Sequence, residues 1–582
     1  MTASVAGARA RFAALAALAA VLAGGCTGTL EGAPVTPNNG GGGGGGVGGA
    51  GSGGAGGQAT TSTGTPTVDM LAASCSSTQL APPMLRRLGA REYAATVSAA
   101  FAPLVTAGVD LSSLISISDD TLSKLRLGND ASVLLVGNQT AQQVMASAES
   151  VAATVTSADH LPQVLPCAAT SPDETCATTF VNTVGAALFR RPLQADETSR
   201  YVGAYRSIVA RADFPTAIKW TLSTMLQSPA MLYRSEIGAK QGAAYQLSPT
   251  EIASALAYDF GGGPPSAALL AQAQSGALAD PTQRVAAAKQ LLLTSAGQQS
   301  LQQFFRQWGL YTRVITETRT VGSFDFPSIR QAMTDETQRF IDEVVVNRKG
   351  SVKDLLTATV TVLTPTLAQY YGYGSPGADW TVVDRPAQAS VGFLAQGSLL
   401  AGNAHPDSSS PTLRGLVVFE RLLCNTRPLP PPNVPQIAPV APGVKTTRQR
   451  YEEQHAAGGA CQACHIHFDP IGFGFEHFDQ TGRYRADDGG LPINAADTAR
   501  APDGTTLFSF DGLTDLAQKL AALPQVSSCV GGYAEAYVFG GGGGQSCLAV
   551  EQRQALVQGQ TGLLDFVASL AAAPSFLQRR AP

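Results

Sequence analysis

The sequence is poor in charge and has no long hydrophobic run. Only 14% of its 582 residues are charged, the formal net charge is -4, and there is no basic run and no acidic tail. Because clustered Lys and Arg are needed to bind phosphate backbones, we expect no nucleic acid partner. No segment approaches the ~18 uninterrupted apolar residues of a membrane-spanning helix. We therefore expect no transmembrane helix.

The first 25 residues are typical of an export signal. Arg9 and Arg11 precede an apolar run, Phe12 to Leu22, that is too short to span a bilayer, and small residues and Cys26 follow it. The pattern resembles a bacterial lipoprotein signal with Cys26 as the lipidated residue, and an ordinary signal peptide is the alternative. Residues 26–66 are rich in Gly, Ala, Ser and Thr, which predicts a flexible tether.

These features place the protein in the bacterial cell envelope, facing the periplasm or the cell surface. The body of the chain would then be soluble and would be held to a membrane only by its N-terminal lipid. Its expected partner is an unknown redox partner or another envelope protein.

Helical periodicity dominates after residue 66, and strand-like alternation is scarce. Ser171-Pro172-Asp173-Glu174 and Ser248-Pro249-Thr250-Glu251 are helix start signals, with a Glu three residues after the Ser and a Pro at the first helical position. The expected fold class is mostly α, built from several small helical domains in series. Helices are expected at 85–97, 171–189, 196–211, 215–226, 248–260, 282–295, 299–308, 327–347, 410–424, 512–523, 526–539 and 549–572. The expected domains are 67–160, 161–240, 241–380, 381–505 and 506–582.

The motif with the clearest chemistry is Cys461-Gln462-Ala463-Cys464-His465. Two thiols at this spacing can bond to the two vinyl groups of a haem while the adjacent His binds the iron. The motif therefore predicts covalently attached haem c, with Cys461 and Cys464 as attachment points and His465 as the proximal ligand. The part around it, 381–505, is expected to be cytochrome-c-like.

The second axial ligand cannot be a downstream Met, because the last Met of the chain is Met333. The candidates are His405, His455, His467 and His477. Of these, His405 and His455 have the freedom to reach the opposite face of the same haem, whereas His467 lies too close to His465. Two His ligands would give a lower potential than Met and His. An iron with no second ligand would be open to peroxide or oxygen.

Two arginines in Gly482-Arg483-Tyr484-Arg485 could hold the haem propionates, because a guanidinium binds a carboxylate through two parallel hydrogen bonds. Their alternative is a solvated end of a strand or loop. Glu476 and Asp479 would share a face of a short helix, where they could orient a ligand His or pair with these arginines.

The same motif has two other interpretations. Cys461 and Cys464, with His455 and one more His, could form a tetrahedral zinc site. The two thiols could instead form a redox-active or structural disulfide.

Six further cysteines remain, an even number that predicts three disulfides in an oxidising compartment. Cys167 with Cys176 and Cys529 with Cys547 would close short loops and are the preferred pairs. Cys75 with Cys424 follows by elimination. Sequence alone permits fifteen connectivities, so the others stay open.

Seven segments carry a resemblance to a known family. They are LRRLGAREYAATV (85–97), FVNTVGAALFRRPLQADE (180–197), MLQSPAMLYRSEIG (225–238), FFRQWGL (304–310), GSLLAGNAHPDSSSPTLRGLVVFERLLC (397–424), CQACHIHFDPIGFGFEHFDQTGRYR (461–485) and FDGLTDLAQKLAALPQVSSC (510–529). In this order they resemble a family of large secreted bacterial proteins, a string of domains of unknown function with a cytochrome-c-like CxxCH near the C-terminal end. The resemblance implies a multi-domain helical protein with a haem and brings no established substrate.

Three functions follow as hypotheses. The first is an exported, lipid-anchored haem protein in electron transfer or an oxidoreductase reaction at the envelope. The second is a non-catalytic binding or scaffold lipoprotein whose CxxCH segment is a zinc or disulfide structural site. The third is a hydrolase that uses Glu476 and Asp479, for which the sequence shows no nucleophile.

Overall fold

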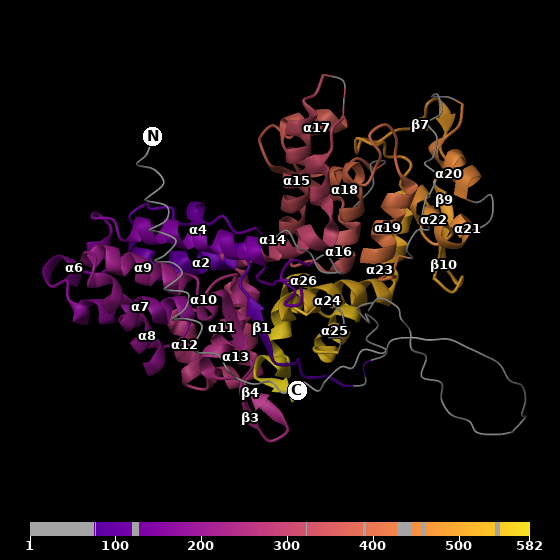
Figure 1. Ribbon diagram of the computed structural model, residues 1–582. Coiled ribbons are helices and arrows are strands. Elements are labelled where there is room, and N and C mark those ends of the chain that lie inside the picture. Colours follow the sequence, from indigo (N-terminus) through magenta and orange to yellow (C-terminus); the bar gives the residue numbers. More distant parts are fainter. Residues whose placement is uncertain are drawn as a thin grey trace, which may run out of the picture. The chain divides into compact units, whose positions relative to one another are not determined.

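Helices make up most of the computed structural model, as the sequence predicted (Figure 1). The structure describes residues 75, 77–118, 127–319, 321, 323–387, 392–427, 444–455, 460–541 and 547–581. The expected signal peptide, the lipidation site Cys26 and the tether lie outside these residues, so those three features stay predictions. Among the described helices, none is long and apolar enough to cross a membrane.

The first group of helices packs around an apolar core that runs from Leu88 to Leu232 and also includes Tyr258. The helix α4 contacts α9, which in turn packs on α8, while α7 touches α2, α8 and α9. The bounds are α2 (Ala90–Ala100), α3 (Ala102–Thr106), α4 (Asn138–Val155), α5 (Leu161–Val164), α6 (Cys167–Thr170), α7 (Glu174–Phe189), α8 (Ala195–Val209), α9 (Phe214–Leu226) and α10 (Pro229–Leu232).

The middle helices share a second core with the C-terminal helices. This core takes apolar residues from Ala81, close to the start of the described chain, to Phe576, close to its end. A smaller core is made of apolar residues from the segment between Val314 and Ala401 in the sequence. The bounds are α11 (Pro249–Gly261), α12 (Ala267–Gln274), α13 (Pro281–Leu292), α14 (Ser295–Gly309), the 3-10 helix η4 (Tyr311–Thr316), α15 (Phe326–Ile341), the π-helix η5 (Asp342–Asn347), α16 (Val352–Thr357), α17 (Pro365–Tyr371) and α18 (Gly397–Gly402).

The last group contains the CxxCH motif, on α21. The bounds are α19 (Pro411–Arg421), α20 (Thr447–His455), α21 (Ala460–His465), α22 (Asp469–Phe473), α23 (Gly512–Ala522), α24 (Pro524–Phe539), α25 (Val550–Val557) and α26 (Leu563–Ser569). Contacts join the described residues into one compact unit. The division of this unit into the domains expected from sequence stays a prediction.

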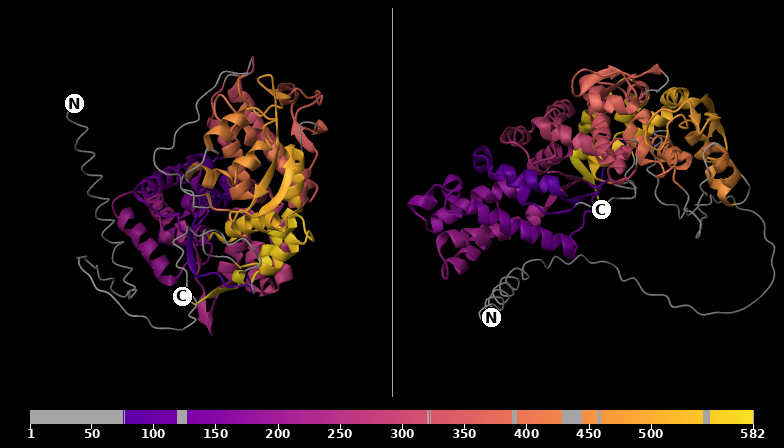
Figure 2. Two further views of the ribbon diagram at one scale, coloured as in Figure 1. Left: turned by 90° about the vertical axis from the view of Figure 1, so that its right-hand side faces the viewer. Right: turned by 90° about the horizontal axis from the view of Figure 1, so that it is seen from above.

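Short antiparallel strand pairs join distant parts of the chain. The sheets have the orders β1-β2, β11-β4-β3, β5-β6, β7-β8 and β10-β9. In Figures 1 and 2 the C-terminal end lies beside β4, because β11 pairs with it. The bounds are β1 (Met84–Arg87), β2 (Tyr233–Glu236), β3 (Ala239–Gln241), β4 (Ala244–Gln246), β5 (Val360–Leu363), β6 (Thr381–Asp384), β7 (Asp487–Asp488), β8 (Leu491–Pro492), β9 (Ala496–Arg500), β10 (Thr506–Asp511) and β11 (Gln578–Arg580).

Several expected helices differ from the structure, two of them markedly. The segment 85–87 belongs to β1, and α2 begins only at Ala90, because β1 pairs with β2 and this pairing is invisible to local periodicity. The expected helix 549–572 is broken into α25 and α26. Gly559 adopts a φ of 68° after the end of α25, a left-handed conformation that interrupts a helix.

All six candidate cysteines form disulfides, but only one expected pair is correct. Cys167 bonds to Cys176, as predicted. The pairs Cys529–Cys547 and Cys75–Cys424 are wrong, since the structure has Cys75–Cys547 and Cys424–Cys529. Cys529 lies in the early part of α24, and the rest of that helix carries the chain about 15 Å further before it ends. A short separation in sequence therefore did not bring the two sulfurs together.

Candidate functional site

The two motif cysteines and His465 come from one short helix, α21. Residues three or four apart on a helix share a face, so the three side chains lie close along one side of it. Cys461 and Cys464 are half-buried free thiols, whereas every other described cysteine is in a disulfide. Cys464 also packs against an apolar cluster of Leu416, Phe419 and Phe468. The structure therefore shows Cys461 and Cys464 as two thiols and not as the disulfide that one interpretation of the motif expected.

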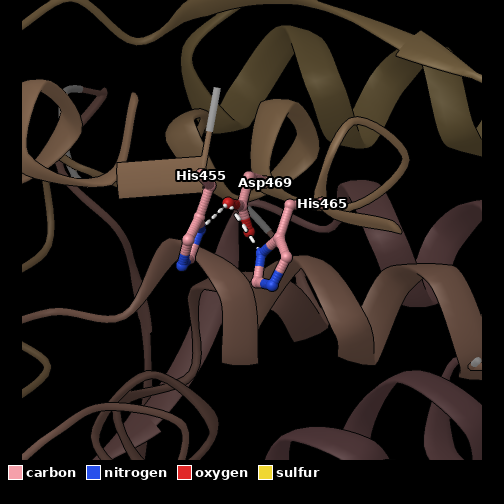
Figure 3. A group of neighbouring side chains, drawn as sticks. All are labelled: His455, His465 and Asp469. Atoms are coloured by element: carbon pink, nitrogen blue, oxygen red, sulfur yellow. Dashed lines mark hydrogen bonds and ion pairs between the residues drawn. The ribbon is translucent and has the colours of Figure 1, made fainter. Parts of the chain in front are cut away.

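A buried carboxylate, Asp469, organises the site (Figure 3). It begins α22 and is 4% exposed. Its Oδ2 lies 3.0 Å from Nδ1 of His465 and 2.6 Å from Nδ1 of His455, and its Oδ1 accepts a hydrogen bond of 2.6 Å from Thr412 Oγ1. Burial alone would raise the pKa of this carboxyl, but the hydrogen bonds from His455 and His465 outweigh burial and lower the pKa. The carboxylate is thus held as an anion between two imidazoles.

This arrangement fixes the tautomer of both histidines. A carboxylate only accepts hydrogen bonds, so each Nδ1 carries a proton, and in the neutral form of each ring Nε2 is the atom with the lone pair. Figure 3 shows both Nε2 atoms pointing away from Asp469, on the same side. The potential ligand atoms of the three residues lie within 4.8 Å of one another, one atom being taken from each. Metal-binding histidines are held in this way by a carboxylate on the other ring nitrogen.

The two imidazoles lie side by side. Their ring centres are 3.6 Å apart and the rings are tilted by 39°. Because a metal–imidazole bond is ~2 Å long, two rings on opposite sides of one ion keep their centres roughly 6 Å apart. In this arrangement His455 is therefore placed to support His465, or to bind the same ion from the same side, and not to bind from the opposite face of a haem.

A close crossing of α19 and α22 brings Thr412 to Asp469. An added Cβ at Gly415 would lie 1.9 Å from the carbonyl oxygen of Phe468, and one at Gly472 would lie 1.9 Å from that of Pro411. Only glycine permits this approach of the two backbones. The crossing sets the position of α22 and so delivers Asp469 to the motif.

Arg414, in the same helix α19, holds the chain that leaves α22. Its fully buried guanidinium donates to the carbonyl oxygens of Leu400, Phe475, Phe478 and Asp479. Burial lowers the pKa of Arg414 to about 10, which still leaves it charged near neutral pH. The side chain therefore satisfies several carbonyl groups that the irregular backbone leaves without partners.

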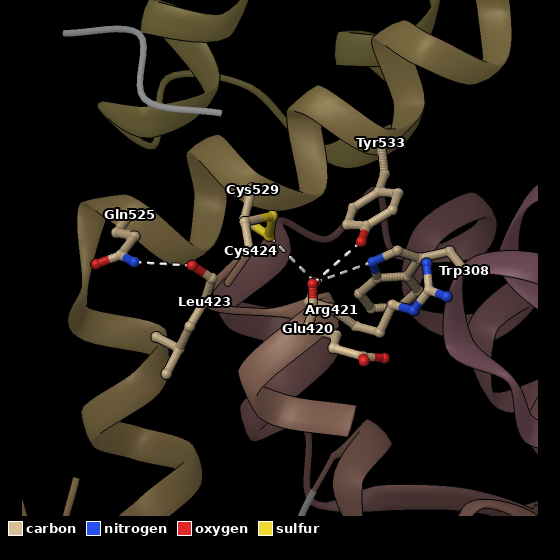
Figure 4. The surroundings of a disulfide bond; sticks show 8 residues. All are labelled: Trp308, Glu420, Arg421, Leu423, Cys424, Gln525, Cys529 and Tyr533. Atoms are coloured by element: carbon tan, nitrogen blue, oxygen red, sulfur yellow. Dashed lines mark hydrogen bonds between the residues drawn. A yellow bond between two sulfur atoms is a disulfide. The ribbon is translucent and has the colours of Figure 1, made fainter. Parts of the chain in front are cut away.

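The C-terminal end of α19 is anchored by the second half of the chain (Figure 4). Trp308 Nε1 donates to the carbonyl of Arg421 at 3.1 Å, and Tyr533 OH donates to that of Glu420 at 3.1 Å. The disulfide Cys424–Cys529 closes the same region. Because the last carbonyls of a helix have no partner within it, these contacts complete α19 and fix its direction.

The other predicted ligands are not gathered at the motif. Among the described residues, the group that could hold a metal ion contains His455, His465 and Asp469, and His405 is not part of it. His405 is exposed, and partial desolvation by its neighbours lowers its pKa. Its backbone N–H donates to the Ser408 carbonyl at 2.9 Å. Its role as a ligand stays a prediction.

The two arginines expected at the propionates have other contacts. Arg485 donates to Glu476 Oε2 at 2.8 Å and to Asp488 Oδ1 at 2.5 Å. Arg483 lies over the ring of Tyr370, 5.5 Å from its centre. Arg485 thus neutralises Glu476, a carboxylate that is 2% exposed and whose pKa burial raises. A role at a propionate stays a prediction for both arginines.

Of the two carboxylates considered for catalysis, Glu476 pairs with Arg485, as one alternative expected. Asp479 accepts hydrogen bonds from the N–H groups of Thr481 and Arg483 and closes a turn. Both lie after α22 and not in a helix. Their contacts are those of residues that hold a loop together.

Sequence reasoning missed Asp469, the centre of the site. The available signal was its spacing, since it stands four residues after His465, where side chains on a helical path meet. Thr412 carried no such signal, because it lies 53 residues before His465 and reaches Asp469 only through the helix crossing.

Three family models match the chain in series. They are PSD5, a protein of unknown function (DUF1595), at 176–236; PSD4, a protein of unknown function (DUF1592), at 247–373; and PSCyt3, a protein of unknown function (DUF1588), at 390–488. The third match contains the helices α19 to α22 and the whole His455–His465–Asp469 cluster. No curated protein and no solved structure matches the chain. The chain therefore carries three domains of unknown function in series, and the name of the third hints at a cytochrome.

Proposed function

We propose that the protein attaches a haem c through Cys461 and Cys464, with His465 as iron ligand, and transfers electrons at the bacterial cell envelope. The observation that carries this proposal is the pair of free, half-buried thiols beside an imidazole whose Nδ1 is held by Asp469 and whose Nε2 is left as a ligand atom. This donor set fits the attachment chemistry of a c-type haem. A bound haem would supply one-electron exchange.

Asp469 has a defined role in this proposal. The negatively charged carboxylate of Asp469 accepts a hydrogen bond from Nδ1 of His465. This makes the imidazole a stronger electron donor at Nε2 and holds the ring in one orientation. A more basic axial ligand favours the oxidised metal, so we expect a low reduction potential. His455 shares the same carboxylate and packs against His465, which restricts the ring further.

The second axial ligand is part of the same proposal. His405 is the remaining candidate, because His455 lies beside His465 and is not placed to bind from the opposite side. Without a second ligand, a bound iron would be open to small ligands. Replacing His405 by Ala separates these cases, because the spectrum should change only if His405 is a ligand.

The site of action is proposed from the N-terminal sequence. Export and lipidation at Cys26 would place the domains in the envelope. An oxidising compartment there would suit both the attachment of haem and the three disulfides. The partner would be a redox protein of the envelope.

A second candidate function is favoured by the side-by-side imidazoles. Two Nε2 atoms on one side are donors that zinc accepts. The thiols of Cys461 and Cys464 are not part of the His455–His465–Asp469 group and would have to approach it to complete a tetrahedral site. The protein would then be a binding or scaffold lipoprotein whose motif is a structural clip, and no redox chemistry would follow.

The test is the absorption spectrum and the intact mass of the mature protein, produced in a host with c-type haem maturation, together with its zinc content. We expect a pyridine haemochrome spectrum of the c type and a mass increase of one haem. The double variant Cys461→Ser, Cys464→Ser should lose both. The matched control is Cys167→Ser, Cys176→Ser, which also removes two thiols and should keep the haem. A colourless protein with one zinc per chain would support the scaffold function and overturn the first proposal.

A further inference from the structure

A polar cavity lies outside the motif, between α2, α14 and η4. Its volume is about 660 Å³, and its walls contain Arg91, Arg306 and Arg313. Among the described residues that line it, none is acidic. The cavity therefore concentrates positive charge in a chain whose net charge is negative.

Each of these arginines donates to an uncharged oxygen. Arg91 donates to the carbonyl of Gln299 and to Oε1 of Gln303, at 3.1 and 2.5 Å. Arg306 Nε donates to Gln338 Oε1 at 3.3 Å, and Arg313 Nη1 donates to an amide oxygen at 2.8 Å. Neutral oxygens hold a guanidinium in place without cancelling its charge.

Elsewhere, some buried arginines pair with acids, whereas Arg190, Arg284 and Arg414 are held by backbone carbonyl oxygens. Arg86 and Arg234 share Asp259, and Arg579 contacts Glu236. Neither Arg91 nor Arg306 has an ion pair in the part of the chain that the structure describes. Both side chains are exposed, so their guanidinium groups can reach a ligand in the cavity, while Asp342 offsets part of the charge of Arg306.

The wall between the arginines is made of glutamines of α14. Gln302 donates through Nε2 to Asp342 Oδ2 at 2.9 Å, and Gln307 accepts from the backbone N–H of Gly128 at 3.1 Å. Asp342 lies behind this wall, where its other oxygen accepts from Gln338. Gln302 thus uses its amide N–H group and keeps its amide oxygen as an acceptor, whereas Gln307 uses its amide oxygen and keeps its N–H group as a donor. Such groups suit a ligand with hydroxyls, which both donate and accept.

We propose that this cavity binds a sugar that carries carboxylate or phosphate groups. The guanidinium groups of Arg91 and Arg306 bind the oxyanions, and the glutamine amides bind the hydroxyls. A cavity of this size holds a ligand of a few sugar units or smaller. The assignment is independent of haem, because none of these residues contacts the motif cluster.

The test is calorimetric titration of the full mature chain with trigalacturonate and, separately, with a hexose phosphate, with neutral galactotriose as control ligand. We expect one charged sugar to bind, more weakly as salt is added, and the neutral sugar not to bind. Tighter binding of trigalacturonate would identify a carboxylated sugar as the ligand, and tighter binding of the hexose phosphate would identify a phosphorylated one.

Variants decide whether binding occurs in this cavity. Arg91→Gln and Arg306→Gln should each weaken binding of the charged sugar about tenfold. Arg211→Gln removes the same charge from an exposed position outside the cavity and should leave binding unchanged. The thermal unfolding midpoints show that the variants fold. The proposal is overturned if neither charged sugar binds, if galactotriose binds equally well, or if both cavity variants bind like the wild type.

Discussion

Asp469 accepts hydrogen bonds from two imidazoles and one hydroxyl although only 4% of its surface is exposed. A neutral amide has the same shape, but it places an N–H group toward one of these donors. The charge of Asp469, and not its size, therefore sets the state of His455 and His465.

The variant Asp469→Asn tests this statement. We expect the free energy of unfolding at neutral pH to fall by about 2 kcal/mol, since hydrogen bonds to a charged acceptor are lost. If haem is bound, the reduction potential should rise, because His465 becomes a weaker donor. Urea unfolding and a redox titration measure the two effects.

The exposed carboxylate Asp196, which pairs with Arg200 on the surface of α8, provides the control. Asp196→Asn should change stability and potential little. An Asp469→Asn protein with the stability and potential of the wild type would contradict the assigned role.

At the scale of elements, the crossing of α19 and α22 is the feature that builds the site. The backbones touch at Gly415 and Gly472, so no side chain can be accommodated between them. The helix α19 then carries Thr412 to the cluster at one end and the disulfide Cys424–Cys529 at the other.

We expect Gly415→Ala to lower the free energy of unfolding by roughly 3 kcal/mol, because the new methyl group would overlap the Phe468 carbonyl. It should also displace Asp469 and alter the spectrum of any metal or haem bound at His465. Thermal unfolding and absorption spectra measure both effects. Gly203→Ala, in the middle of α8 with no atom within 4 Å of the new methyl, should be neutral or stabilising. Equal effects of the two substitutions would argue against the crossing as a constraint.

Element boundaries were predictable where the signal was local. The helix α11 begins where the Ser248 capping box predicted and stops at Gly262, whose φ is 66°. The start of α7 was placed too early, because Asp173 and not Ser171 caps it. The strand β1 could not be predicted, since its partner β2 lies about 150 residues further along.

At the scale of the whole molecule, a buried ion network joins three distant parts of the chain. Glu236 of β2 contacts Arg86 of β1, Arg234 of its own strand and Arg579 of β11. Burial opposes the ionisation of Glu236, but these arginines lower its pKa to about 2. Asp259, which contacts two of the arginines, has its pKa raised by burial.

Glu236→Gln should lower the free energy of unfolding at neutral pH by about 3–5 kcal/mol, because the arginines keep their charge and lose a buried partner. The folded pKa of Glu236 lies below its ordinary value of 4.5, so its contribution is complete above that pH and is lost as the pH falls toward 2. The difference between wild type and variant should therefore shrink in acid. Urea unfolding between neutral and acidic pH checks this, and a difference that stays constant would contradict it.

The sequence alone determined the helical class, the CxxCH motif, the two ends of α11 and the pair Cys167–Cys176, because each depends on residues close together in the chain. The tertiary structure decided the other two disulfides, the strand β1, the crossing at Gly415 and the sharing of Asp469 by two histidines. These features join residues far apart in sequence or depend on how backbones approach, and only the packing of the folded chain brings such groups together.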